Sequence, residues 1–178
     1  FRLLRLLTAC FCWSGPPRRL WREKSIMVKS LLRSDLTSLY PILTYGGAIP
    51  FVMGAVCLAV DIRSVPFLGA TVDVVGAYGL VIASFLSGAH WQLHLNQNAG
   101  WSLFLALSSN VMAISLWTVF LVLAPEAFFL ALSFIFLIFL AIDHRLAICG
   151  LINKRYFRTR AGVTGIVVLF LIFSGLIV

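Results

Sequence analysis

The stretch from Val74 to Leu95 reads VVGAYGLVIASFLSGAHWQLHL. It holds no Asp, Glu, Lys or Arg, and it ends in a run of polar and aromatic side chains. At about 1.5 Å of rise per residue, a helix of this length approaches the roughly 30 Å of a bilayer's hydrocarbon core. The stretch therefore predicts a transmembrane helix with a polar end.

Four further apolar segments flank this stretch, at about residues 42–60, 101–123, 127–148 and 162–178. The chain is 61% hydrophobic and 11% charged, whereas soluble domains carry about 25% charged residues. The short connections favour antiparallel neighbours. We therefore expect an all-α integral membrane bundle of five transmembrane helices within residues 40–178.

Orientation follows from the Lys and Arg residues. Five of them lie between the fourth and fifth segments, and only Arg63 lies on the other side of the membrane. Eight precede the first segment: Arg2, Arg5, Arg18, Arg19, Arg22, Lys24, Lys29 and Arg33. The positive-inside rule then predicts an inside N-terminus and an outside C-terminus, in a bacterial inner (plasma) membrane or a mitochondrial inner membrane.

Residues 1–39 form a basic tail outside the apolar segments. It can be an Arg-rich targeting presequence, a membrane-surface helix, or an upstream translation product with Met27 as the true start. Arg2 and Arg5 interrupt its only apolar run, which disfavours a secretory signal. We favour a mistranslated or disordered tail.

Small residues recur at helical spacing in the second segment. Gly79, Ala83 and Ser87 share one face, and Ser84 with Gly88 makes a neighbouring pair. Such residues let helix backbones approach closely in membranes, so we predict that this helix lies at the centre of the bundle. In the first segment, Pro50 predicts a kink and a freed backbone carbonyl.

Polar side chains at one membrane depth define a candidate site. In the predicted topology three helices place them near the inner leaflet, where ionisable groups usually face the bundle interior. The candidates are His90, Trp91, His94, Asn110, Asp143 and His144. A metal site, a proton or ion relay and a hydrogen-bonded cluster that joins helices are all compatible with them. The cluster is favoured, and no resident metal or cofactor is predicted.

Asp143 can pair with Arg145 or with Arg160 at the entrance of the fifth segment, which would clamp two helices. The basic residues between the last two segments are interpreted as topology signals and lipid-headgroup contacts rather than a nucleic-acid surface. They are Arg145, Lys154, Arg155, Arg158 and Arg160.

No motif of soluble enzyme chemistry occurs in the chain, such as a P-loop or an H-E-x-x-H. We predict a non-enzymatic accessory, assembly or structural membrane protein, with the bilayer and possible membrane subunits as partners. Two alternatives stay open: a small transporter or proton-coupled channel using His90, His94 and Asp143, and a lipid- or quinone-binding protein.

Several motifs resemble a family of small multi-spanning proteins that includes transmembrane protein 69 and is defined by domain of unknown function 3429. The matching residues are Pro41–Leu43, Gly46 or Gly47, Pro50-Phe51, Tyr78-Gly79, Ser84–Gly88, His90-Trp91, Asp143 and Tyr156–Arg160. The resemblance covers roughly residues 40–178 and departs at Thr159, where an apolar residue is expected. It implies a multi-pass inner-membrane protein and supplies no activity, and it adds weight to Gly88, His90, Trp91 and Asp143.

Overall fold

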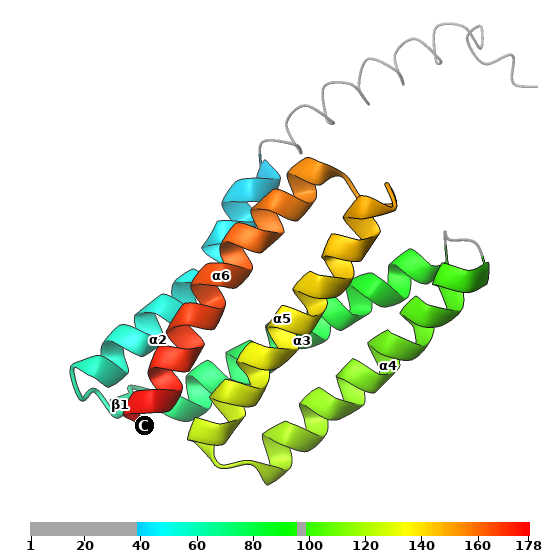
Figure 1. Ribbon diagram of the computed structural model, residues 1–178. Helices are drawn as coiled ribbons and strands as arrows, with labels where there is room; N and C mark the ends of the chain where they lie inside the picture. The colour runs from blue at the N-terminus through cyan, green and yellow to red at the C-terminus, as the bar shows by residue number, and fades with distance from the viewer. Residues whose placement is uncertain (1–38, 96–98) are drawn as a thin grey trace, which may run out of the picture. The chain divides into compact units, whose positions relative to one another are not determined.

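The computed structural model describes residues 39–95 and 99–178, and residues 42–178 form one compact helical unit (Figure 1). The elements are α2 (Ile49–Ala59), β1 (Ser64–Val65), β2 (Gly69–Ala70), α3 (Thr71–His94), α4 (Ala99–Val122), α5 (Pro125–Ile148) and α6 (Lys154–Ile177). Helical turns over residues 39–46 precede α2. The five predicted transmembrane helices are confirmed as helices long and apolar enough to cross a membrane.

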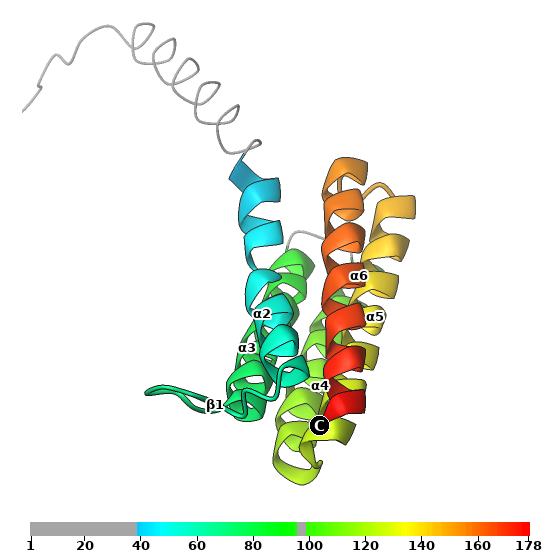
Figure 2. The same ribbon diagram turned by 90° about the vertical axis from the view of Figure 1, so that its left-hand side faces the viewer.

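The helices run alternately up and down, so the bundle has two ends. We call the end where α3 and α5 finish and α6 begins the basic end, because it carries Arg145, Lys154, Arg155, Arg158 and Arg160. The opposite end carries the antiparallel β1–β2 hairpin, which projects sideways between α2 and α3 (Figure 2), and we call it the hairpin end.

The break that Pro50 predicts in the first span lies just before it. Residues 47 and 48 form a turn, and α2 begins at Ile49 with the proline in its first turn. The Phe51 amide donates to the Ala48 carbonyl rather than to Gly47 four residues back. The Gly47 carbonyl instead accepts the Tyr78 hydroxyl at 3.0 Å, so α3 satisfies the group that the break frees.

The last span starts earlier than its hydropathy predicts. We expected it at residue 162, and α6 begins at Lys154. The Asn153 side chain accepts from the Arg155 amide at 2.8 Å and caps the helix. The basic residues that lower the local hydropathy are therefore helical, which makes α6 a full span and orders Arg160 on its second turn.

The centre of the bundle is shared by α3 and α5. The helix α3 packs against α2, α4 and α5, as expected of a central helix, but a larger share of α5 is buried. The reason is that α5 supplies most of the large core side chains, whereas the buried face of α3 is mostly small. The α5 contribution is Phe128, Phe129, Leu132, Ile135, Phe136 and Phe139.

The two small-residue stripes of α3 have different surroundings. Gly79, Ala83 and Ser87 are buried, and a Cβ added at Gly79 would lie 2.5 Å from Leu132 Cδ2. The neighbouring pair does not pack as we expected: Ser84 is exposed, and a Cβ at Gly88 would meet nothing within 4 Å. The difference arises because the first stripe faces the interior of the bundle, whereas the pair is rotated onto the outer face of α3.

Candidate functional site

Three helices meet in one ionic cluster at the basic end. His90 of α3 lies with Nε2 2.9 Å from Asp143 Oδ1 of α5. Arg160 of α6 donates from Nε and Nη2 to Asp143 Oδ2, at 3.2 and 3.1 Å. The three side chains are 6%, 3% and 12% exposed. We call this group the His90–Asp143–Arg160 cluster.

The sequence positions each member by helical register. His90 follows Ser87 by three residues, so it continues the buried face of α3 that Gly79 and Ala83 begin. Asp143 follows Phe139 by four residues on the buried face of α5, and the rings of His90 and Phe139 lie 5.4 Å apart. The capped start of α6 places Arg160 opposite both.

Both oxygens of the Asp143 carboxylate are occupied, which decides what the cluster can do. An ionised carboxylate only accepts hydrogen bonds, so His90 must carry a proton on Nε2. The fixed guanidinium fork of Arg160 compensates the buried charge. Such pairing stabilises a carboxylate that would otherwise be costly at membrane depth.

A cavity of about 320 Å³ adjoins the cluster. It is lined by Ala89, His90, Leu93, Asp143, Ile152, Asn153 and Tyr156. The second ring nitrogen of His90, Nδ1, is buried and has no hydrogen-bond partner among the described residues. A polar molecule in this cavity would meet an imidazole and a carboxylate that are already held in place.

Of the predicted candidates, His90 and Asp143 are the two that come together from different helices within the described residues. His94 hydrogen-bonds through Nδ1 to the Trp91 carbonyl of its own helix, and Trp91 is exposed. His144 is exposed and contacts the Phe157 ring at 5.3 Å. These side chains flank the cluster in sequence but point elsewhere around their helices.

The third helix of the cluster is α6. We had predicted α4 as the third helix because of Asn110, but α4 contributes no side chain to the cluster. The Asn110 amide donates to the Ala106 carbonyl of its own helix at 2.8 Å, and the residue is exposed. The contact between α3 and α4 is a different one, from the Ser87 hydroxyl to the Ser109 carbonyl at 2.6 Å.

The basic residues divide into three groups. Of the two partners considered for Asp143, the structure pairs it with Arg160 and not with Arg145. Arg145 instead lines a groove between α4 and α5. Lys154, Arg155 and Arg158 are exposed on the first turns of α6, and their contact with lipid headgroups remains a prediction.

The donor set around Asp143 does not resemble a metal centre. Across residues 39–95 and 99–178, no three His, Cys, Asp or Glu side chains are grouped so that they could hold a metal ion. His94, which a three-ligand site would need, hydrogen-bonds within its own helix. A guanidinium against the carboxylate would also oppose a bound cation.

Sequence reasoning placed Arg160 only as one of two possible partners, and it missed the cavity beside His90 and the groove beside Arg145. The sequence signal for Arg160 was the helix-capping residue Asn153, which marks the start of α6. Arg160 follows it by seven residues, or about two helical turns, so it lies on the helix rather than in a loop. The cavity and the groove had no such signal, since each depends on how helices diverge.

Five apolar helices, with an ionic cluster buried between three of them, define a multi-pass helical membrane protein. The chain belongs to the family described as "Protein of unknown function (DUF3429)", whose model matches residues 37–176. The resemblance predicted from the sequence is thereby confirmed at the level of this family, and its link to transmembrane protein 69 stays a prediction. Comparisons with curated proteins and with solved structures gave no match.

Proposed function

We propose that this protein is a non-enzymatic accessory or structural subunit of an inner-membrane complex. The observation that carries this proposal is the use of Asp143, whose two oxygens are both engaged by side chains of other helices. A carboxylate employed in this way fixes the ends of α3, α5 and α6 relative to one another. It leaves little free chemistry for turnover.

The packing between the cluster and the hairpin end supports a static role. The core there is built from large apolar side chains such as Phe51, Phe129 and Phe136. The buried Ser133 hydroxyl donates to the Phe129 carbonyl of its own helix at 2.8 Å. A polar route through the bundle would have to open this core.

The exposed pair on α3 is the surface that we assign to a partner. Ser84 and Gly88 are one turn apart on an outer face, and no side chain of the described residues covers Gly88. In lipid, small residues at this spacing favour close approach of a second helix. A membrane subunit with a matching small-residue helix would pack there.

A native purification in mild detergent tests the proposal. We expect stoichiometric membrane subunits to co-purify with the wild-type chain and to be lost from Gly88→Leu, while helicity is unchanged. Gly165→Leu is the matched control, because a Cβ at Gly165 also meets nothing within 4 Å but lies on α6. A chain that purifies alone and monomeric would contradict an accessory role.

The orientation and the compartment belong to the same proposal: the basic end faces the cytoplasm or the matrix. Labelling with a membrane-impermeant maleimide tests this in a chain with single cysteines. Cys149 is exposed near the basic end, and Phe67 is fully exposed in the hairpin. We expect Phe67→Cys to react from outside and Cys149 to react only after permeabilisation. The reverse pattern would invert the topology.

A second candidate function is proton- or ion-coupled transport, which the cavity beside His90 favours. His90 and Asp143 both line this cavity, and the buried Nδ1 of His90 has no hydrogen-bond partner among the described residues. Flux in proteoliposomes that is lost in His90→Gln, at unchanged protein level, would support transport. Flux that persists in this variant would exclude a relay through His90.

A further inference from the structure

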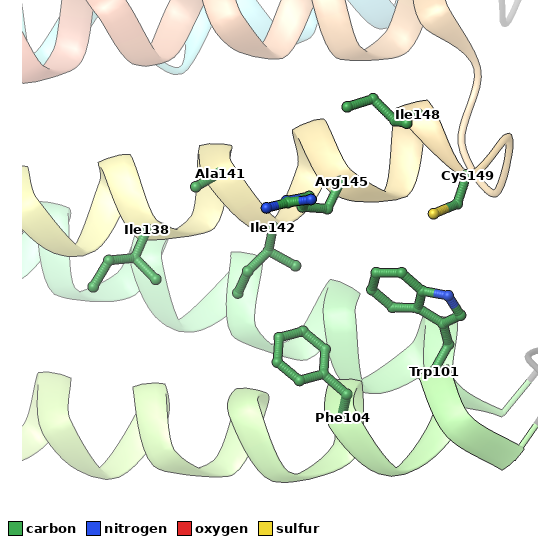
Figure 3. A pocket seen from close by; sticks show the side chains of 8 residues that line it. All are labelled: Trp101, Phe104, Ile138, Ala141, Ile142, Arg145, Ile148 and Cys149. Atoms are coloured by element: carbon green, nitrogen blue, oxygen red, sulfur yellow. The ribbon is translucent and has the colours of Figure 1, made fainter.

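An open groove of about 650 Å³ lies between α4 and α5 at the basic end (Figure 3). It is lined by Trp101, Phe104, Ile138, Ala141, Ile142, Arg145, Ile148 and Cys149. We propose that this groove binds one anionic glycerophospholipid, with an acyl chain among its apolar side chains and the phosphate on Arg145. This site is separate from the His90–Asp143–Arg160 cluster, and the inference does not depend on the proposed accessory function.

The apolar length of the groove fits a hydrocarbon chain. Ile138, Ala141 and Ile142 lie along one side of α5, and Phe104 of α4 lies opposite them (Figure 3). Ile142 also belongs to a buried cluster with Leu105 and Leu146, against which Trp101 and Ile138 pack, and this cluster closes the groove toward the interior of the bundle. The groove therefore opens toward lipid, where an acyl chain can fill it without exposing a polar group.

The charged end of the groove fits a phosphate. Arg145 is exposed and has no ion-pair partner within residues 39–95 and 99–178, since Asp143 is paired with Arg160. A guanidinium presents paired donors that match the oxygens of a phosphate. A ligand with one hydrophobic chain and one phosphate would therefore satisfy both parts of the groove.

The two parts have the order that a lipid has. Figure 3 shows the Trp101 indole toward the end marked by Cys149, Ile138 toward the other end, and the Arg145 side chain between them, beside Ile142. Tryptophan is favoured at the level of lipid headgroups, so the phosphate would lie at the depth of the basic end and the chain would extend into the bilayer.

The surroundings favour an anionic headgroup over a zwitterionic one. Lys154, Arg155 and Arg158 are exposed at the same end, on the first turns of α6. A basic residue close to an anionic headgroup contributes about 1 kcal/mol of attraction, which corresponds to about fivefold in affinity, and this attraction falls off within a Debye length. Because Lys154, Arg155 and Arg158 do not line the groove, each contributes much less than this to a lipid that the groove holds. These three residues act on any anionic lipid near this end, whereas Arg145 alone is part of the groove.

The test is native mass spectrometry of the full chain, released from nanodiscs of phosphatidylcholine with and without phosphatidylglycerol. We expect one retained phosphatidylglycerol per chain, bound about fivefold more weakly by Arg145→Ala. Arg158→Ala is the matched control, because it removes a charge of the same end outside the groove, and it should retain the lipid.

A second pair of variants tests the acyl-chain part. Ala141→Phe fills the groove and should release the lipid even with Arg145 intact, whereas Ala113→Phe on the exposed face of α4 should not. Equal retention of phosphatidylcholine, equal loss in Arg145→Ala and Arg158→Ala, or full retention in Ala141→Phe would each overturn the proposal. A quinone or a partner helix found in the groove would also overturn it.

Discussion

The two ends of the bundle hold their helices together by different contacts, ionic at the basic end and close packing at a glycine toward the hairpin end. At the basic end, charged side chains of α3, α5 and α6 meet around the buried Asp143. Toward the hairpin end, α2 approaches α3 where a side chain is missing, since a Cβ at Gly54 would lie 2.1 Å from Val75 Cγ2. An acid and a base also pair at the hairpin end, as Asp61 and Arg63, but both are exposed and two residues apart.

The difference shows what the membrane demands of a helix contact. Lipid offers no hydrophobic drive for helices to associate, so close packing and internal polar contacts must provide it. Glycine contacts set how near two helices come, whereas the Asp143 contacts set which three helices meet. An ion pair with the same chemistry in water does neither.

The largest effect is expected from removing the buried charge. Asp143→Asn leaves Arg160 as an uncompensated buried cation and should destabilise the chain by about 3–5 kcal/mol. Thermal and denaturant unfolding in detergent, followed by circular dichroism, would measure this. Asp61→Asn is the matched control at the exposed pair, and a similar loss in both variants would refute the contrast between the ends.

The energy of the cluster can be separated from its role in helix choice by replacing two members together. Asp143→Leu with Arg160→Met removes both charges, and buried pairs exchanged for apolar side chains often lose no stability. We expect the double variant to be more stable than Asp143→Asn. If it were less stable, the cluster would contribute net attraction rather than specificity.

The next effect is expected at the glycine contact. Gly54→Ala should destabilise the chain by about 1–3 kcal/mol, because Val75 is β-branched and has few rotamers in a helix with which to yield. Adding Val75→Ala should recover part of the loss. Gly88→Ala, which meets nothing within 4 Å, serves as the control and should not destabilise. Equal losses at the two glycines would argue against close approach.

These two kinds of contact were not equally visible in the sequence. The spans were predictable because length and apolarity alone decide whether a helix crosses a bilayer. The stripe of Gly79, Ala83 and Ser87 was predictable because helical period places its members on one face. The Gly54 contact was not predictable, because a single glycine belongs to no periodic pattern. Its role depends on the side chain that packs against it, and that neighbour is not visible in the sequence.

The site was predictable in its depth and only partly in its members. Depth follows from position along a span, so His90 and Asp143 were correctly expected at one level. Which side chains face one another depends on the rotation of each helix about its axis. This rotation turns three predicted members away from the cluster, namely His94, His144 and Asn110. Arg160 was underweighted because the basic turns of α6 read as a loop by hydropathy.

A smaller loss of stability is expected from the hydrogen bond that the Tyr78 hydroxyl donates to the Gly47 carbonyl. This carbonyl is left free by the helix break before Pro50. Interhelical hydrogen bonds in membranes average about 0.6 kcal/mol, so Tyr78→Phe should lose about this amount of stability. In a Pro50→Ala background the Gly47 carbonyl can accept from Phe51 instead, and the loss should shrink. An unchanged loss there would separate the tyrosine from the helix break.

The smallest effect is expected from removing the charge of Arg63 in the exposed ion pair at the hairpin end. Arg63→Gln should cost about 0.5 kcal/mol or less, because solvent screens a pair whose side chains are 57% and 78% exposed.

Asp61 matters more for its backbone than for its charge. Its φ of 61° ends α2, and the amide of Ile62 donates back to the Cys57 carbonyl at 2.8 Å. Asp61→Ala should therefore cost about 1 kcal/mol and Asp61→Asn less, since asparagine tolerates this conformation. Equal unfolding midpoints for the alanine and asparagine variants would show that the turn tolerates any residue, and a midpoint of Arg63→Gln below both would return the role to the ion pair.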